Sequence, residues 1–311
     1  MGVAAKPVSL ISVVIPVKNG GERIRRCLEA IRAQVIADEV EIIAVDSGST
    51  DGTQTLVRSF GGLVEEIEAR DFNHGETRNL GARLAQGEIV VFTVDDALPV
   101  GTDWLEQLVA PLRKKGELAG TYARQVAYDD APAHQHFYID YRYGAEPRLQ
   151  RASGPQDLTV SNVLFSNVSS AVKRSLLLEF PFASDIVIAE DLEWSARVLL
   201  AGHAIAYVPD SVVRHSHAYT LLDAVKRYFD QGAAAERSYM SGEASPGRVR
   251  REGLTLVRQE LAWLWQNERS AIPYALAHEI ARFVGFQLGV HHQHVPRALR
   301  PRLSRTPVYW R

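Results

Sequence analysis

The sequence predicts an α/β fold with a mostly parallel central sheet, followed by a C-terminal helical extension. Two observations support this prediction. Over the first two thirds of the chain, short apolar runs rich in β-branched residues alternate with segments whose apolar residues recur at helical spacing. From Leu221 onward the strand-like runs disappear and only helical patterns remain. We therefore divide the 311 residues into an α/β domain of residues 1–219 and a helical region of residues 220–311.

The first strand and helix set the pattern. Leu10–Val17 reads LISVVIPV, an apolar run typical of a buried strand, and Glu22–Gln34 follows with apolar residues at helical spacing. The same alternation predicts strands at Glu41–Val45, Gly62–Glu68 and Glu88–Val94, and helices at Thr53–Phe60, His74–Ala85 and Thr102–Lys114. Ligands of such sheets bind beyond the carboxyl ends of the strands, and polar clusters fall there in this sequence.

The second part of the chain is less regular. After a strand-like run at Ala119–Ala127, residues 133–150 form an aromatic and polar stretch that we interpret as a surface helix and loop. The α/β pattern then resumes with strands at Leu164–Val172, Ala204–Val208 and Val212–His215 and a helix at Asp191–Leu200. The C-terminal helices are predicted at Leu221–Ser241, Val249–Asn267 and Pro273–Val290, with a break at Glu243–Gly247.

Composition narrows the class of protein. The net charge is −2 and the pI is near 6.6, so no overall basic field favours binding to nucleic acid. The single cysteine, Cys27, lies on the apolar face of the first helix and has no partner for an internal disulfide, which fits packing in a reducing cytosol. No run approaches the ~18 apolar residues that span a bilayer. We expect a cytoplasmic protein that is soluble or peripheral to the membrane.

The loop Asp46–Thr53 follows a buried strand and precedes a helix. Turn chemistry and helix capping alone favour its Asp, Ser and Gly residues. The functional alternative places Asp46 at the carboxyl edge of the sheet, where its carboxylate meets a nucleotide base or ribose. A dinucleotide site is disfavoured, because Pro16–Gly21 does not contain the G-x-G-x-x-G pattern.

A second polar segment begins the helix at His74. Asn73 and Glu76 have the spacing of a capping box, which explains both residues without a ligand. Capping does not explain Arg78 and Asn79, because a cation is unfavourable near the positive end of the helix dipole. A nearby anionic diphosphate would reverse that preference.

Three further groups of acidic residues or histidines lie after predicted strands or at the start of a predicted helix. Asp95 and Asp96 come directly after an apolar strand, where they are either ordinary loop acids or ligands for Mg²⁺ or Mn²⁺ bridging substrate phosphates. Glu190–Asp191 opens a helix, either as favourable helix-end charges or with a catalytic base. His215 and His217 follow one strand later and favour a metal or phosphate role. A carboxylate base beside a metal-bound leaving group is suited to group transfer to a hydroxyl.

Taken together, these segments resemble the family 2 glycosyltransferases, inverting enzymes of GT-A fold that use nucleotide sugars. The resemblance covers about Ser9 to Tyr219, where the family segments occur in order: IPVKN, VDSGSTDGT, TRNLGA, the acidic strand end, the ED helix and HSH. A narrower resemblance is to bacterial rhamnosyltransferases of surface-polysaccharide synthesis. Its signatures are Asp71–Asn79, Arg124–Gln125, Ser166–Ser170, Ala189–Asp191, His215–His217 and Lys226–Gly232.

The resemblance implies transfer of L-rhamnose from dTDP-rhamnose to a hydroxyl of a lipid-linked glycan, with inversion at the anomeric carbon. Asp191 takes the role of catalytic base, and Asp96, His215 and His217 are the expected ligands of Mg²⁺ or Mn²⁺. The residues expected to hold the nucleotide are Pro16, Val17, Asp46, Ser47, Arg78 and Asp95. Those expected to contact the acceptor are Ser169, Ser170, Glu190 and Trp194.

One position departs from the family pattern. In the family's D-x-D motif, Val94 occupies the position of the first aspartate, so that Asp95 is the middle residue and Asp96 the retained metal ligand. This departure puts the strength of metal dependence in doubt. It also leaves open a non-catalytic sugar-nucleotide-binding scaffold. A nucleotidyltransferase is a further alternative, because such enzymes can share the nucleotide-binding half of the sheet.

The C-terminal region suggests a contact with a membrane surface. Its apolar residues Phe283, Val284, Phe286, Leu288 and Val290 precede a tail that carries Arg297, Arg300, Arg302, Arg305 and Arg311. Apolar groups followed by cations suit the inner face of the cytoplasmic membrane, where a lipid-linked acceptor is found. The alternative is a helix packed on the catalytic domain or on a second copy in a homo-oligomer, with a solvated basic tail.

Overall fold

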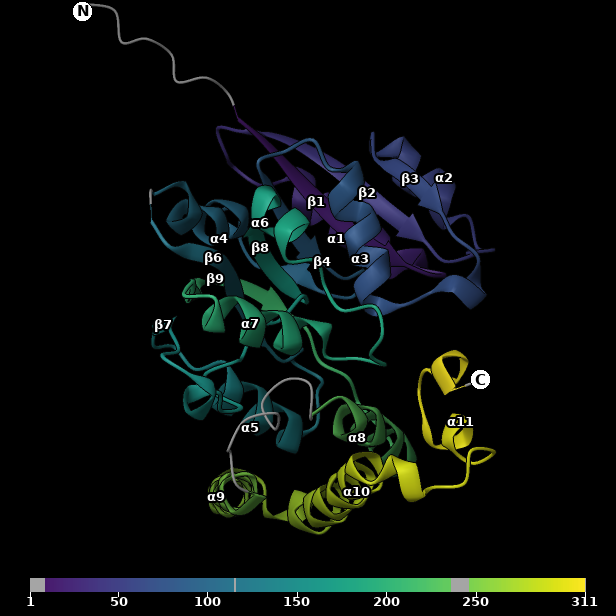
Figure 1. The fold of residues 1–311 in the computed structure, drawn as a ribbon, viewed down its shortest axis with the longest axis vertical. Coiled ribbons are helices and arrows are strands. Elements are labelled where there is room, and N and C mark those ends of the chain that lie inside the picture. The colour runs from purple at the N-terminus through teal and green to yellow at the C-terminus, as the bar shows by residue number, and fades with distance from the viewer. Residues whose placement is uncertain (1–8, 115, 236–245, 311) are drawn as a thin grey trace, which may run out of the picture.

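The computed structural model describes residues 9–114, 116–235 and 246–310. These residues form a nine-stranded sheet in the order β3-β2-β1-β4-β8-β6-β9-β5, with β7 paired to β9 (Figure 1). The strands are β1 (Leu10–Val17), β2 (Glu39–Asp46), β3 (Leu63–Glu66), β4 (Ile89–Thr93), β5 (Leu98–Pro99), β6 (Leu118–Val126), β7 (Arg148–Gln150), β8 (Ser169–Lys173) and β9 (Ala204–Arg214).

The prediction of a mostly parallel sheet is confirmed. Strands β1, β2, β3, β4, β6 and β9 run in one direction, whereas β5, β7 and β8 run in the opposite one. Val17 at the end of β1 pairs with Asp46 at the end of β2, so these carboxyl ends are level. Strand β8 lies antiparallel between β4 and β6 and joins the two parallel parts of the sheet.

Helices cover both faces of the sheet, which explains why β1 is apolar along most of its length. Its residues Ile11, Val13 and Ile15 pack with α1, α2 and α4, and Val14 packs with α3, α6 and α7 on the other face. These helices are α1 (Gly21–Arg32), α2 (Thr53–Ser59), α3 (His74–Leu84), α4 (Trp104–Arg113), α6 (Arg174–Glu179) and α7 (Glu190–Leu200).

Two strand predictions need correction. The predicted strand Leu164–Val172 is wrong over its first part, because only Ser169–Lys173 pairs in the sheet. The backbone before it forms a turn and hydrogen-bonds with side chains instead: Gln150 donates to the carbonyl of Leu164 at 2.8 Å. The predicted strands on either side of Pro209 form one strand, β9, with a register irregularity between Val208 and Val212.

The aromatic stretch is not a surface element. It forms helix α5 (Ala133–Arg142) and strand β7, and His134, Phe137 and Ile139 are buried. Phe137 lies against Trp263, with ring centroids 6.1 Å apart, because helix α9 (Pro246–Asn267) covers α5. A helix that is polar at many positions is therefore enclosed between the sheet and the C-terminal helices.

The C-terminal helices gather beside α5, at the end of the molecule away from β3 (Figure 1). They are α8 (Leu221–Ala235), α9, α10 (Ile272–Val290) and the short α11 (Arg300–Leu303). The predicted end of the first helix at Ser241 lies outside the described residues, as does the break up to residue 245. Pro246 and Gly247 belong to α9, so the break does not extend to Gly247.

Helices α8 and α10 touch through their backbones. A Cβ atom on Gly289 would lie 2.1 Å from the carbonyl oxygen of Phe229, and one on Gly285 would lie 2.3 Å from the carbonyl oxygen of Val225. Any larger side chain at these positions forces the helices apart. Because glycine has no side chain, Gly285 and Gly289 allow the two helices to lie this close together.

The segment after α10 packs back onto α8. The Asp230 carboxylate accepts hydrogen bonds from the backbone N–H of Arg305 at 2.8 Å and from the indole N–H of Trp310 at 3.4 Å. The guanidinium of Arg305 lies 3.4 Å from Asp223. Arg300 donates to the carbonyl of Val295 at 3.0 Å.

A uniformly solvated basic tail is therefore the wrong picture. Arg300 and Arg305 make contacts within the protein, although Arg305 is itself exposed, as are Arg297 and Arg302. Arg311 lies outside the described residues.

Candidate active site

A cavity of about 760 Å³ lies at the carboxyl ends of the parallel strands. The loops after β1, β2, β4 and β9 contribute to its wall, as do the N-terminal residues of α7 and the turn before β8. Among the predicted site residues, those that line it are Pro16, Val17, Ser47, Arg78, Asp95, Asp96, Glu190, Asp191, His215 and His217. The topology thus brings together residues as far apart in the sequence as Pro16 and His217.

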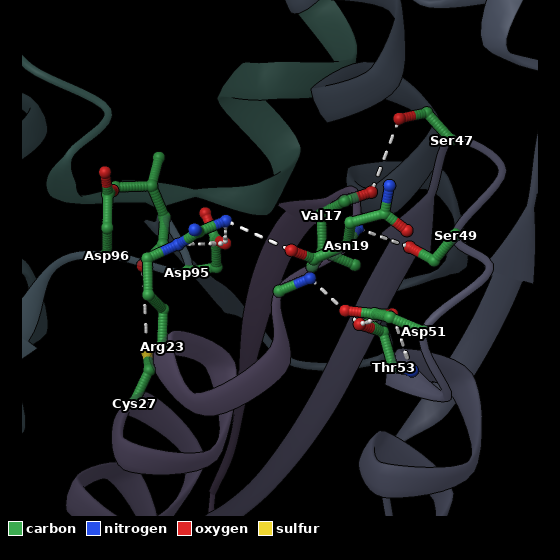
Figure 2. Close-up of polar contacts among 12 residues, drawn as sticks. Val17, Asn19, Arg23, Cys27, Ser47, Ser49, Asp51, Thr53, Asp95 and Asp96 are labelled. Atoms are coloured by element: carbon green, nitrogen blue, oxygen red, sulfur yellow. Dashed lines mark hydrogen bonds and ion pairs between the residues drawn. The ribbon is translucent and has the colours of Figure 1, made fainter.

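The loops after β1 and β2 hold each other in place (Figure 2). The backbone N–H of Asn19 donates to the Ser49 hydroxyl at 2.7 Å, and that of Gly20 donates to the Thr53 hydroxyl at 2.9 Å. The Thr53 hydroxyl donates in turn to Asp51 at 2.6 Å. The turn-chemistry interpretation of this loop is thus correct for Asp51, which accepts hydrogen bonds from the N–H and the hydroxyl of Thr53. The capping interpretation is wrong, because the N-cap of α2 is Gly52 and no side chain of the described residues caps that helix.

Asp46 occupies a different position in the same loop. One oxygen of its buried carboxylate accepts hydrogen bonds from the N–H groups of Gly48 at 3.0 Å and Ser49 at 2.8 Å, and from the Gln54 amide at 3.1 Å. The second oxygen is buried without a hydrogen-bond partner in the part of the chain that the structure describes. Asp46 is fully buried and is not part of the cavity wall, so the expected contact with the base or ribose has no counterpart in the lining of the cavity.

The two adjacent aspartates after β4 have different partners. Asp95 accepts hydrogen bonds from Nε and Nη2 of Arg23, at 3.2 and 3.0 Å, and Arg23 also reaches the carbonyl of Asn19 (Figure 2). Burial and then the Asp96 carboxylate raise the pKa of Asp95, and Arg23 opposes both effects. Asp95 therefore joins the β4 end to helix α1. Asp96 is left to face the histidines.

Asp96, His215 and His217 form a cluster with the composition of a metal site. One ligand atom from each residue can be chosen so that all of them lie within 4.8 Å of one another. His215 Nε2 lies 3.8 Å from one Asp96 oxygen, and His217 Nδ1 lies 3.7 Å from the other. One carboxylate and two imidazoles suit a divalent transition ion such as Mn²⁺. The donor set therefore fits the expected cation.

The surroundings of the cluster favour metal-binding forms of the histidines. Burial and then His217 lower the pKa of His215 to about 4, and burial lowers that of His217. Both rings are neutral at pH 7 as a result, which is the form that binds metals. Nδ1 of His215 lies 3.0 Å from Oε1 of Gln125, and this contact orients the ring with Nε2 toward Asp96.

The first residues of α7 carry the predicted base. Ala189 precedes them with a φ of 65°, a left-handed conformation in which the chain turns sharply into the helix. Asp191 accepts hydrogen bonds from the backbone N–H of Leu192 at 2.9 Å and of Asn167 at 3.3 Å. Burial and then the Glu190 carboxylate raise the pKa of Asp191 to about 7. A carboxylate with such a pKa can accept a proton from a hydroxyl at neutral pH.

Helix α3 holds this region in place. Arg78 Nη1 lies 2.9 Å from Glu190 Oε1, and both side chains are buried. Burial alone would raise the pKa of Glu190, but Arg78 and then His74 lower it, so Glu190 stays ionised. The Asn79 amide exchanges hydrogen bonds with the backbone of Phe182 at 2.8 and 2.9 Å.

These contacts change the interpretation of the helix start. Arg78 does not need a diphosphate to compensate its charge, because Glu190 does so, although its side chain also lines the cavity. Asn79 serves the loop before α7 and is absent from the cavity wall. Asn73 caps α3 as predicted, with its side-chain oxygen 2.9 Å from the N–H of Glu76.

The predicted acceptor contacts are wrong for three residues. Trp194 is fully buried, and its indole N–H donates to the carbonyl of Phe180 at 2.8 Å. Ser169 accepts from the Trp104 indole at 2.9 Å, and Ser170 donates to Asn167 at 2.9 Å. All three belong to the core, because helices cover both faces of the sheet. The cavity is lined instead by the preceding residues Ser166, Asn167 and Val168.

Several residues of the cavity wall had no predicted role. Gln125 orients His215 and donates to the Ser166 hydroxyl at 2.9 Å. Arg23 supports the cavity residue Asp95 without being part of the wall itself. Gln125 and Asn167 fall in segments that carry the family resemblance, which is the signal that could have marked them. No local pattern marks the residues that α5, α9 and α10 contribute, including His134, Glu260 and His278.

The sequence is similar to that of known glycosyltransferases. The model of "Glycosyl transferase family 2" matches residues 12–178. The O-antigen chain rhamnosyltransferase RfbN of Salmonella typhimurium is 31% identical over 307 residues and is matched over 96% of either chain. The O-antigen chain rhamnosyltransferase WbaN of Salmonella anatum is 30% identical over 303 residues, which cover 96% of this chain and 95% of WbaN.

Solved structures of GT-A glycosyltransferases share the fold. Mannosyltransferase PcManGT from Pyrobaculum calidifontis, in complex with GDP-Man and Mn²⁺, has a TM-score of 0.61 at 19% identity, over 92% of this chain and 88% of that one. TarS of S. aureus, in complex with UDP, has a TM-score of 0.53 at 16% identity, over 92% and 93% of the two chains. With its GT-A fold and its close sequence relatives, this chain is a glycosyltransferase and belongs to glycosyl transferase family 2.

Proposed function

We propose that the protein transfers L-rhamnose from dTDP-rhamnose to a hydroxyl of a lipid-linked glycan, with inversion at the anomeric carbon. The observation that carries this proposal is one cavity that holds both Asp191, whose pKa is raised to about 7, and the Asp96–His215–His217 cluster. The first group suits proton removal, and the second suits the charge of a leaving diphosphate. The choice of rhamnose is supported by the names of the relatives RfbN and WbaN.

In the proposed reaction, the acceptor oxygen forms a bond to the anomeric carbon as the bond from that carbon to the phosphate oxygen breaks. The proton of the acceptor hydroxyl passes to a carboxylate oxygen of Asp191, and dTDP leaves with the bonding electron pair. Glu190 remains ionised beside Arg78, which keeps a second negative charge next to Asp191 and raises its basicity.

The cation would be held by Asp96, His215 and His217. When bound, it supplies positive charge that stabilises the diphosphate of the donor and of the product. The imidazoles favour Mn²⁺ over Mg²⁺, because Mg²⁺ prefers an all-oxygen shell. Val94 does not prevent this arrangement, since the histidines provide the donors that the missing first aspartate would have provided.

The nucleotide is assigned to the loops after β1 and β2. Pro16, Val17 and Ser47 line that part of the cavity. Asp46 is fully buried and does not line the cavity, so its proposed part is to hold the loop of Ser47 through its hydrogen bonds with the N–H groups of Gly48 and Ser49. Arg78 and Asp95 line the same cavity and contribute charge near the donor, each held by its own partner, Glu190 and Arg23.

A panel of dTDP-rhamnose, UDP-glucose and GDP-mannose, measured by thermal shift with and without Mn²⁺, tests the donor. We expect the largest shift with dTDP-rhamnose and Mn²⁺, because a ligand that binds only the native state raises its apparent stability. Turnover by Asp191→Asn, with the exposed Asp210→Asn as control, tests the base. Wild-type turnover by Asp191→Asn combined with normal donor binding would refute the mechanism.

The alternatives make different products. A nucleotidyltransferase releases pyrophosphate, whereas a glycosyltransferase releases dTDP, so product analysis separates them. A scaffold binds the nucleotide sugar without turnover even when a lipid-linked acceptor is supplied. The family assignment and the Asp191 environment favour the glycosyltransferase over both alternatives.

We also infer that α10 rests on an anionic membrane surface, where a lipid-linked acceptor is presented. On α10, Ile280, Phe283, Val284 and Leu288 are 64%, 63%, 42% and 36% exposed, whereas Phe286 and Val290 are half-buried. Arg297 and Arg302 follow in the chain and are exposed. Among the described residues, no helix is long and apolar enough to cross a bilayer. The same face could instead join two copies of the chain, and the vesicle experiment in the Discussion separates these occupants.

A further inference from the structure

The cavity continues past the predicted catalytic groups to the helices of the C-terminal region. Helices α5, α9 and α10 contribute His134, Glu260 and His278 to its wall, and Tyr138, Tyr228 and Arg282 lie in the same part. These helices gather beyond the sheet (Figure 1), so this end is distinct from the loops assigned to the nucleotide. We call these six residues the helical cluster.

The helical cluster contains buried polar atoms that have no partner. Glu260, His134 and His278 are only 2%, 3% and 4% exposed. Oε2 of Glu260 and Nε2 of both histidines make no hydrogen bond within the described residues. The two imidazole centroids are 4.8 Å apart. Because buried polar groups are otherwise hydrogen-bonded, several unpartnered atoms on one cavity wall indicate that a ligand supplies the partners.

The charges of the helical cluster identify the kind of ligand. The Arg282 guanidinium is paired with Glu279 and lies 4.4 Å from the ring centroid of Tyr138 and 4.6 Å from that of Tyr228. Burial lowers the pKa values of His134 and His278, so both rings are neutral at pH 7. A neutral imidazole offers one donor and one acceptor.

A ligand that is rich in both donors and acceptors but carries no charge matches this wall better than a phosphate does. An anion would have to compete with Glu279 for Arg282 and would lie close to the Glu260 carboxyl group. Hydroxyl groups, in contrast, both donate and accept hydrogen bonds, as the neutral imidazoles do.

We propose that the helical cluster is a subsite for a neutral sugar residue of the acceptor, bound by Glu260, His134 and His278. The identification of this sugar as part of the acceptor rests on the proposed function, whereas the proposal that a neutral sugar binds here does not depend on it. The subsite makes the C-terminal helices part of the substrate-binding machinery. It also gives α5 a role that the sequence alone did not suggest.

Binding is tested with a panel of methyl glycosides of neutral hexoses and 6-deoxyhexoses. Saturation-transfer NMR is recorded on the full chain in the presence of dTDP and Mn²⁺, so that the nucleotide site is filled. We expect at least one glycoside to bind the wild type and its affinity to fall about tenfold or more in Glu260→Gln and in His278→Phe. The exposed Glu268→Gln and His294→Phe are the matched controls, and they should bind as the wild type does.

A second measurement needs no variant. A methyl glycoside that carries a photoreactive diazirine is cross-linked to the wild-type protein, and the labelled peptides are mapped by mass spectrometry. Labelling is expected on peptides from α5, α9 and α10. The proposal is overturned if no glycoside in the panel binds, if both variants bind normally, or if the label maps to other elements.

The two proposals fail in different ways. A protein that transfers rhamnose but is labelled elsewhere refutes the subsite alone. A protein that binds glycosides at the helical cluster but neither binds nor uses dTDP-rhamnose refutes the proposed function alone.

Discussion

Arg78 and Glu190 form a buried ion pair that joins α3 to the first residue of α7, with 2.9 Å between Nη1 and Oε1. Their side chains are 7% and 5% exposed, so neither charge is compensated by solvent. The pair lies next to Asp191, and the ionised Glu190 is one cause of the raised pKa of Asp191. One contact thus serves both the stability of the fold and the proposed chemistry.

Replacement of Arg78 should destabilise the protein strongly. In Arg78→Met a buried carboxylate is left alone, which typically costs about 3–5 kcal/mol. Arg83→Met is the matched control on the same helix: Arg83 pairs with Glu76 at 2.7 Å, but both side chains are about half exposed, and such a pair contributes roughly 0–1 kcal/mol. Urea denaturation measures both variants. Equal losses of unfolding free energy would contradict the importance of burial here.

The pH profile should report Asp191. A general base acts in its ionised form, so kcat/KM should rise as the pH increases through about 7, the raised pKa of Asp191, and level off above it. The free energy of unfolding should change in the opposite direction. The folded protein binds the Asp191 proton more tightly than the unfolded chain does, so the contribution of Asp191 to the free energy of unfolding falls as the pH rises from about 4 to about 7. In Asp191→Asn this limb of both profiles should be absent. If the pH dependence near 7 persists in Asp191→Asn, it arises from a titrating residue other than Asp191.

The two adjacent aspartates should differ in their effect on metal-dependent donor binding. Asp96→Ala removes the carboxylate of the Asp96–His215–His217 cluster, so we expect it to abolish most of the increase in donor affinity that Mn²⁺ produces. Asp95→Ala instead releases Arg23 and should leave the Mn²⁺ effect largely intact. Titration calorimetry with dTDP-rhamnose, with Mn²⁺ or with EDTA, makes the comparison. Similar, mild effects of both changes would argue against the cluster as a metal site.

The contact between α8 and α10 should tolerate no side chain. In Gly289→Ala the new Cβ would lie 2.1 Å from a backbone oxygen of α8, and we expect a loss of about 1–3 kcal/mol of unfolding free energy. Gly253→Ala in α9 meets nothing within 4 Å, so it should stabilise the protein by about 0.5–1 kcal/mol through its better helix propensity. Denaturation midpoints check both values. A neutral Gly289→Ala would mean that the helix pair is loosely held.

Vesicle binding should depend on the exposed face of α10. Co-sedimentation with anionic vesicles should be lost when Ile280 and Phe283 are both changed to Gln, because each buries apolar area worth roughly 1.5–3 kcal/mol in the interface. Arg297→Gln and Arg302→Gln should each cost about 1 kcal/mol, an effect that high salt removes. Leu63→Gln, which alters a half-exposed leucine of the distant β3, is the control. No binding by the wild type at low salt, with dimers that the Gln changes dissociate, would assign this face to oligomer contact.

The sequence predicted the sheet well where the hydrophobic pattern is continuous. Strand β1 has the predicted bounds, because an apolar run of this length is buried on both faces whatever its neighbours are. Burial on both faces also explains why the predicted acceptor contacts of Ser169 and Ser170 are wrong. The two residues are consecutive and point to opposite faces of the strand, and both are buried because helices cover both faces. Trp194 was misplaced although Val198 and Leu199 follow it at the helical spacing of a core face, and all three are buried in one cluster.

Residues of the cavity wall could be predicted where a family segment carried them, as with Asp191, Asp96 and the histidines, whose roles stay predictions. The helical cluster could not, since His134 and Glu260 are brought together only by the packing of α9 on α5. Arg78 illustrates the middle case. Its unfavourable place at the start of a helix was a correct signal that an anion lies nearby, but the anion in the structure is Glu190 and no ligand is needed to explain it.

Neighbouring residues of α10 face opposite surroundings, as Arg282 lines the cavity and Phe283 is exposed. Because the glycine contact holds α10 firmly against α8, a bilayer touching Phe283 would lie about one helix diameter, roughly 10–12 Å, from the cavity. If the proposed membrane contact and acceptor subsite both hold, only sugars near the membrane-bound end of the lipid-linked glycan would reach the cavity. The thickness of a single helix would then select acceptors by length, early in chain growth.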